Sequence, residues 1–238
     1  MYFYSHVGVQ GERFIAHNLT FENTAGPANK QAVAVRNDAD LSIFYKCSFL
    51  GYQDTLYLHH NHQFYRDCDI YGTIDFIFGN AAAVLQNCNI YARKPLSRQS
   101  NTITAQSRSL PDDKTGISIH NCSIRAAPDL QEDPNSTKTY LGRPWEQLST
   151  TVIMQSFLDA LIEPEGWLEW DGRRGLDTLY YGEYENKGPG ADTRGRVQWR
   201  GYRPAMNETD AYNFTVFNFI SGEDWLWNTS VPFVPGLL

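Results

Sequence analysis

The sequence predicts an all-β fold: a parallel β-helix, or solenoid, with C-terminal loops and a short helix packed on it. Residues 47–57 (CSFLGYQDTLY) and 68–78 (CDIYGTIDFIF) align at a constant offset of 21 residues. Short runs rich in Val, Ile, Phe, Thr and Tyr surround them and show little helical periodicity. A solenoid explains both, because each coil buries its apolar face only by stacking on its neighbours.

The repeat is marked by a few positions that recur in the same order. Cys, Gly and Asp recur as Cys47/Cys68, Gly51/Gly72 and Asp54/Asp75, with apolar equivalents at Phe49/Ile70 and Leu56/Ile77. Cys88-Asn-Ile and Cys122-Ser-Ile repeat the opening, and Phe21 and Phe157 resemble weaker outer copies. Residues 91–115, rich in Arg, Ser and Asp, are expected to form loops that project from the coil.

Two other folds fit the repeat less well. A leucine-rich repeat would show a Leu-x-x-Leu-x-Leu pattern, which is missing. A β-sandwich shares the short strands, but nothing in a sandwich requires a 21-residue offset. The repeat therefore favours the solenoid.

The C-terminal part has a different composition. Five of the six Trp lie beyond residue 166, in aromatic and Gly-rich segments. A short helix is expected to begin near Thr209. No linker-like stretch separates this part from the repeats, so residues 1–238 are interpreted as a single domain.

Composition excludes several classes of protein. The 238 residues are 42% hydrophobic and 20% charged, which argues against a disordered chain. The 20 basic and 27 acidic side chains give a net charge of −7, a poor match for nucleic acid. No apolar run approaches the roughly 20 residues of a membrane span. We expect no nucleic-acid partner and no membrane insertion.

Six N-x-[ST] sequons favour a secreted protein, although residues 1–6 do not resemble a signal peptide. They lie at Asn18, Asn121, Asn135, Asn207, Asn213 and Asn228. Asn18 and Asn121 fall in segments read as strands, where a glycan fits poorly.

The four cysteines, Cys47, Cys68, Cys88 and Cys122, share one phase of the repeat. Buried thiols are the favoured interpretation, since free Cys is among the most buried residues. Disulfides remain the alternative, with Cys88–Cys122 the best-placed pair. No Cys-x-x-Cys pair occurs, and the histidines of LYLHHNHQF (His59, His60, His62) match no zinc motif, so no metal is expected.

Two aspartates carry the predicted chemistry. Asp54 and Asp75 occupy equivalent positions on adjacent coils, so their side chains should emerge roughly 5 Å apart. When two carboxyls lie this close, the pKa of one rises and that of the other stays low, which allows an acid and a nucleophile or base to coexist. Ordinary turn aspartates are the alternative, but the apolar neighbours in GYQDTLY and DFIFG argue against it.

Amide, guanidinium and aromatic side chains complete the candidate site. Gln31 lies about one coil before Gln53, and two such amides can stabilise an oxyanion, which favours acyl chemistry. Arg143 in YLGRPW can hold a carboxylate through two hydrogen bonds. The aromatic side chains expected to contact sugar rings are Trp145, Trp167, Tyr57 and Phe78.

Six segments together resemble plant-type pectinesterases, the pectin methylesterases of the cell wall: KQAVAVR, GYQDTLY, DFIFGN, YLGRPW, GWLEWDG and YYGEYENKGPGA. The resemblance implies a right-handed parallel β-helix that hydrolyses methyl esters of pectin without a metal or organic cofactor. It also implies a secreted cell-wall protein whose partners are pectin and a proteinaceous inhibitor.

The resemblance also implies a role for each candidate residue. Asp75 would be the nucleophile and Asp54 the acid/base. Gln31 and Gln53 would form the oxyanion hole, and Arg143 would orient Asp75. Trp145 and Trp167 would line the sugar groove.

The chain departs from the family pattern at its start. Nothing before Phe14 supplies the family's Gly-x-Tyr-x-Glu motif, and Lys30 stands where His is frequent. We expect that the first coils are missing and that 1–238 alone is marginally stable and weakly active. A non-catalytic pectin-binding protein and a polygalacturonase-like glycosidase are therefore the alternative functions.

Overall fold

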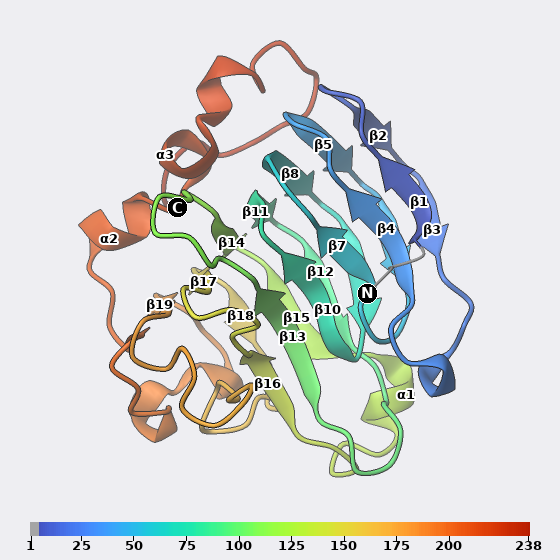
Figure 1. Cartoon of the computed structure of the whole chain (residues 1–238), viewed down its shortest axis with the longest axis vertical. Coiled ribbons are helices and arrows are strands. Elements are labelled where there is room, and N and C mark those ends of the chain that lie inside the picture. The colour runs from blue at the N-terminus through green and yellow to red at the C-terminus, as the bar shows by residue number, and fades with distance from the viewer. Residues whose placement is uncertain (1–4) are drawn as a thin grey trace.

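The computed structural model describes residues 5–238 as a coil of parallel strands arranged in three sheets (Figure 1). The first sheet contains β1 (Ser5–Val9), β4 (Val33–Asn37), β7 (Leu56–Leu58), β10 (Ile74–Gly79), β13 (Asn101–Gln106) and β16 (Thr139–Gly142). The second contains β2 (Ile15–His17), β5 (Ser42–Tyr45), β8 (His62–Arg66), β11 (Ala82–Gln86), β14 (Gly116–His120), β17 (Thr150–Met154), β19 (Tyr180–Tyr184) and β20 (Tyr202–Arg203). The third contains β3 (Thr20–Glu22), β6 (Ser48–Leu50), β9 (Asp69–Gly72), β12 (Asn89–Ala92), β15 (Ser123–Ala126) and β18 (Phe157–Leu158). The predicted parallel β-helix is confirmed.

The strand register follows the sequence repeat. Phe49 pairs with Ile70 and Leu56 with Ile77, as the 21-residue offset predicts. Phe21 pairs with Phe49 and so belongs to the ladder. The interpretation of Phe157 was wrong by one position, because Leu158 pairs with Ile124 while Phe157 pairs with Ser123.

The sequence suggested that residues 91–115 form loops, but this prediction was wrong for part of the segment. These residues contain β13, whose six residues are all buried. The segment NTITAQ was misread because four of its six side chains are polar; their hydrogen bonds are made inside the protein, as with the Thr104 hydroxyl and the Leu141 carbonyl (2.9 Å). Polar composition alone therefore did not indicate exposure.

A residue with a left-handed backbone conformation forms the corner between the second and third sheets. It precedes each strand of the third sheet, at Asn18, Lys46, Asp67, Asn87, Asn121 and Gln155, where φ lies between 51° and 58°. Asn18 and Asn121 are therefore turn residues, and the expectation that they lie in strands was wrong. Asn18 is exposed and Asn121 is half-buried.

The core is a set of ladders that run along the coil. Phe44 of β5 stacks on Tyr65 of β8, with ring centroids 5.0 Å apart. The four cysteines are buried free thiols, which agrees with the favoured interpretation, and Cys88 and Cys122 are not bridged. The backbone N–H of Cys88 instead donates to the Cys122 sulfur at 3.3 Å.

The C-terminal residues pack against the second sheet (Figure 1). The helix expected near Thr209 is two short helices, α2 (Glu208–Tyr212) and α3 (Val216–Ile220), because Thr215 is extended and caps α3. Val216 and Ile220 pack near Val84 of β11. The other helical segments are α1 (Pro128–Gln131) and the 3₁₀ turns η1 (Pro27–Asn29), η2 (Pro189–Ala191), η3 (Thr193–Gly195) and η4 (Gly222–Asp224).

Within residues 5–238, none of the helices combines the length and apolar character that a membrane crossing needs.

Candidate active site

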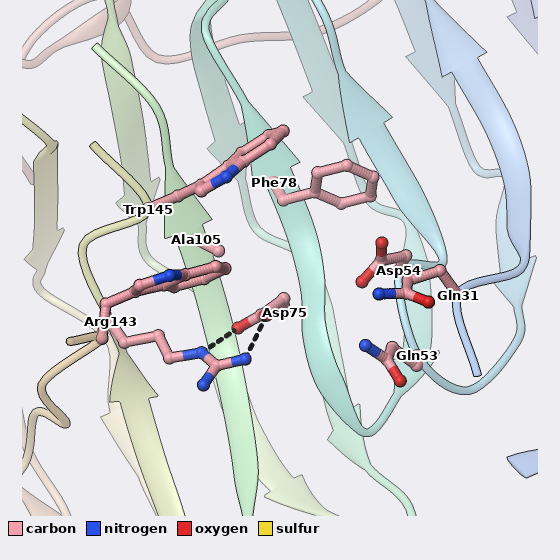
Figure 2. Close-up of a pocket in the computed structure, with 9 residues that line it drawn as sticks. Gln31, Gln53, Asp54, Asp75, Phe78, Ala105, Arg143 and Trp145 are labelled. Atoms are coloured by element: carbon pink, nitrogen blue, oxygen red, sulfur yellow. Dashed lines mark hydrogen bonds and ion pairs between the residues drawn. The ribbon is translucent and has the colours of Figure 1, made fainter. Parts of the chain in front are cut away.

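A cavity of about 140 Å³ opens on the outer face of the first sheet. It is lined by Gln31, Gln53, Asp54, Asp75, Phe78, Ala105, Arg143, Trp145 and Trp170 (Figure 2). These side chains come from segments more than 130 residues apart, and stacking of the coils brings them together. All five residues predicted to be catalytic line this one cavity.

The two aspartates share an unusual backbone conformation. Asp54 has φ 64° and Asp75 has φ 51°, in the left-handed region that Asp tolerates better than most residues. Asp54 comes just before β7, and Asp75 is the second residue of β10. The Asp54 N–H donates to the carbonyl of Ile74 at 3.0 Å, which ties the two turns together. The predicted equivalence of the two positions therefore extends to their backbone.

Arg143 holds the carboxylate of Asp75 through two hydrogen bonds (Figure 2). Its Nε donates to Oδ1 at 2.8 Å and its Nη2 donates to Oδ2 at 2.6 Å. Arg143 follows the end of β16, and its own N–H donates to the carbonyl of Thr104 at 3.0 Å. A buried carboxylate held in this way has a defined orientation and a stabilised negative charge.

Asp54 has a different environment. Burial raises its pKa to about 8, and the negative charge of Asp75 adds to the shift, while Arg143 partly offsets it. No side chain among residues 5–238 donates a hydrogen bond to the carboxyl group of Asp54, a residue that is 6% exposed. Asp54 is therefore protonated at neutral pH and can act as an acid.

The amides of Gln31 and Gln53 lie on the Asp54 side of the cavity (Figure 2). The N–H of Ala32 donates to the Gln53 carbonyl at 3.1 Å, which fixes the two segments beside each other. Neither side-chain amide bonds to another residue in the described chain, 5–238. Their N–H groups are therefore available to a bound carbonyl oxygen.

An aromatic row extends the cavity along the sheet. Tyr57 stacks on Phe78 at 4.4 Å, Phe78 contacts Trp145 at 6.0 Å, and Trp145 faces Trp170 at 6.3 Å between ring centroids. Trp145 and Trp170 are half-buried, so part of each ring faces solvent. Tyr57 is 7% exposed and supports Phe78 from behind, outside the cavity lining.

Trp167 does not line the groove, so that prediction was wrong. It is 1% exposed, packs against the tilted ring of Tyr181 with centroids 4.2 Å apart, and donates its indole N–H to Glu183 at 3.3 Å. Trp170, three residues later in GWLEWDG, takes the predicted place, and the centroid of its ring lies 4.2 Å from the Arg143 guanidinium carbon. The sequence contained both Trp residues but no signal for which one faces outward.

The histidines of LYLHHNHQF lie beside acidic residues at the end of the row. His59 pairs with Asp38, and His62 lies 3.0 Å from Asp40. His60 and His62, the first residue of β8, are exposed, whereas His59 is half-buried. Among residues 5–238, no group of three or more His, Cys, Asp or Glu side chains is placed to hold a metal ion.

Comparison with known proteins identifies one family. The pectinesterase family model matches residues 1–223. A probable pectinesterase/pectinesterase inhibitor 47 from Arabidopsis thaliana is 63% identical over 97% of this chain, and pectinesterase 2 from Citrus sinensis is 60% identical over 97%. The structure of pectin methylesterase from carrot superposes with a TM-score of 0.96 at 52% identity, covering 98% of this chain and 73% of that one.

The match covers only part of the curated relatives. The chain spans 37% of the length of the Arabidopsis protein and 45% of the Citrus protein.

Proposed function

Since the chain belongs to the pectinesterase family, we propose that it hydrolyses the methyl esters of pectin (homogalacturonan), releasing methanol and leaving free carboxylates. One observation carries this proposal: a carboxylate held by Arg143 shares a cavity with a second, protonated carboxyl and two unengaged amides. Acyl transfer needs these three elements, namely a nucleophile, a proton donor and oxyanion donors.

In the first step, a carboxylate oxygen of Asp75 attacks the ester carbonyl carbon. The tetrahedral oxyanion is stabilised by the amide N–H groups of Gln31 and Gln53. Asp54 donates its proton to the methoxy oxygen, so the C–O bond breaks and methanol leaves. The product is an anhydride between Asp75 and the sugar carboxyl.

In the second step, Asp54 is ionised and acts as a base. It takes a proton from a water molecule, whose oxygen attacks the acyl carbon of the anhydride. The bond to Asp75 breaks, the sugar leaves as a free carboxylic acid, and Asp54 again carries its proton. Both aspartates return to their starting state.

The aromatic row supplies the sugar-binding surface. Trp145 and Trp170 present partly exposed rings beside Phe78, and flat apolar faces suit the C–H groups of sugar rings. These side chains would hold the polymer while Arg143 and the aspartates act on one of its esters.

A glycosidase reaction is the second candidate, because paired carboxyls also cleave glycosidic bonds. The two amides favour the esterase. Purified residues 1–238 should release methanol from methyl-esterified galacturonan without new reducing ends. New reducing ends without methanol would contradict the esterase, and binding without either product would establish a non-catalytic pectin-binding protein.

Several relatives are named as pectinesterase/pectinesterase inhibitor proteins. We extend the proposal to a secreted protein of the plant cell wall that carries glycans on exposed sequons such as Asn135 and Asn228. A proteinaceous inhibitor is the proposed regulatory partner. Glycan mapping and inhibitor titration of methanol release test the two statements separately.

A further inference from the structure

Asp75 lies in a bulge between two strands of the first sheet. Ile74 of β10 pairs with Thr102 of β13, and Ile77 pairs with Thr104, so three steps along β10 match two along β13. Asp75 also has the left-handed φ of 51°. A bulge re-aims a side chain and interrupts the ladder of backbone hydrogen bonds. The N–H of Asp75 therefore needs a partner other than a strand carbonyl.

Thr102 supplies that partner and also binds the carboxylate. The Asp75 N–H donates to the Thr102 hydroxyl oxygen at 2.9 Å, and the same hydroxyl donates its proton to Asp75 Oδ1 at 2.6 Å. Thr102 is 1% exposed, so water does not compete for these bonds. One hydroxyl thus joins the backbone and the carboxylate of the same residue into a closed ring.

We propose that Thr102 is the positioning residue of the nucleophile, an inference that rests on the proposed esterase function. Asp75 Oδ1 accepts from both Thr102 and Arg143 Nε, whereas Oδ2 accepts from Arg143 Nη2 alone among the described residues. Oδ2 keeps the lone pair that is not engaged by the protein. Thr102 therefore selects Oδ2 as the oxygen that attacks the ester carbonyl.

The turn of Asp54 has no hydroxyl group that bonds to both its backbone and its carboxyl group, among the described residues. Its N–H donates to the backbone carbonyl of Ile74, and no hydroxyl within residues 5–238 reaches its carboxyl group. An acid/base must serve the methoxy oxygen first and a water molecule second, so some rotational freedom suits it. The Thr102 hydroxyl is placed only where a fixed direction of attack is required.

Thr102→Val tests the role of the hydroxyl, with Thr102→Ser as the conservative rescue. We expect kcat for methanol release to fall by about 10- to 100-fold with little change in KM, because the attacking oxygen loses its alignment. Thr102→Ser should keep most of the wild-type kcat.

Thr104→Val is the matched control. Thr104 lies on the same strand and is equally buried, but its hydroxyl donates to the Leu141 carbonyl at 2.9 Å and does not contact Asp75. Thr104→Val should lower the melting temperature without the loss of kcat. Thr102→Ala replaces Thr102→Val if the valine variant does not fold. A folded Thr102→Val or Thr102→Ala variant with wild-type kcat would overturn the proposal.

Hydrogen exchange of the Asp75 amide tests the bond between its N–H and the Thr102 hydroxyl independently of activity. The exchange should accelerate in Thr102→Val, where the N–H has lost its acceptor, and stay slow in Thr104→Val. Unchanged protection in Thr102→Val would also overturn the proposal. A wild-type protein that releases no methanol would refute the esterase function, and accelerated exchange in Thr102→Val alone would then show only that Thr102 holds the backbone of Asp75.

Discussion

The turns that carry Asp54 and Asp75 are copies of one repeat, yet they assign different chemistry to the same side chain. Both aspartates are buried, and both have a left-handed backbone. Asp75 is held by Arg143 from 68 residues away and by Thr102 from 27 residues away. Asp54 has neither contact, and burial raises its pKa to about 8. Repetition therefore produces the pair, whereas long-range neighbours decide which member is the nucleophile.

A second buried ion pair sharpens this comparison. Arg196 donates to Glu183 with the same two-bond geometry, at 2.8 and 3.1 Å. Glu183 also accepts from Trp167 at 3.3 Å and from Tyr202 at 2.9 Å, and it is closed off from solvent. Three of these bonds go to Oε1, and Oε2 accepts from Arg196 Nη2 alone, but both oxygens lie in the core. Asp75 differs because its carboxylate faces a cavity, where Oδ2 can reach a substrate.

The largest expected effect is that of Asp75→Asn. We expect turnover to fall by about 10⁴-fold or more, because an amide is a poor nucleophile, while the fold is retained. Methanol release and cooperative thermal unfolding are the two measurements. An Asp75→Asn variant that releases methanol at the wild-type rate would show that the nucleophile is another group.

Asp54→Asn is the control for that substitution. It leaves the nucleophile in place and removes only proton transfer, so the loss should be smaller, about 10²- to 10⁴-fold. The comparison of the two turns is reversed if Asp54→Asn costs more activity than Asp75→Asn.

Gln53→Ala should come next in size. Removing one oxyanion donor lowers kcat by about 10²-fold and leaves KM nearly unchanged, because the amide acts mainly on the charged intermediate. Steady-state kinetics on methyl-esterified galacturonan separate the two parameters. A change confined to KM would place Gln53 in ground-state binding.

The pH dependence follows from Asp54. Its pKa of about 8 means that the proton needed for methanol departure is present below that pH and lost above it. We expect kcat/KM to fall about tenfold per pH unit on the alkaline side, with an apparent pKa near 8. If the alkaline fall of kcat/KM persists unchanged in Asp54→Asn, it is caused by another group.

The smallest effect is expected from the aromatic row. Trp170→Ala should raise KM several-fold, by about 1 kcal/mol of lost contact, with little loss of stability because Trp170 is half-buried. Trp167→Ala should instead destabilise the fold by about 3–5 kcal/mol, since it leaves a cavity in the core. Equal effects of the two substitutions on KM would contradict the assignment of Trp170 to the sugar-binding surface and of Trp167 to the core.

Some features could be predicted from sequence because the coil converts a repeat directly into neighbours. The 21-residue offset predicted the pairing of Leu56 with Ile77, and it placed Asp54 beside Asp75. Local pattern also marked Arg143 within YLGRPW, whose guanidinium does bind Asp75. These predictions needed only the strand spacing of a parallel sheet.

The sequence by itself therefore determined the parallel coil, the stacking of its repeats and the pair of carboxyls. Only the tertiary structure decided that Trp170 and not Trp167 faces the cavity, and that residues 101–106 form a strand whose Thr102 holds Asp75. The physical reason is that periodicity records which side chains stack along the coil. Which side chains meet across coils and loops depends on packing between segments that have no fixed spacing in the chain.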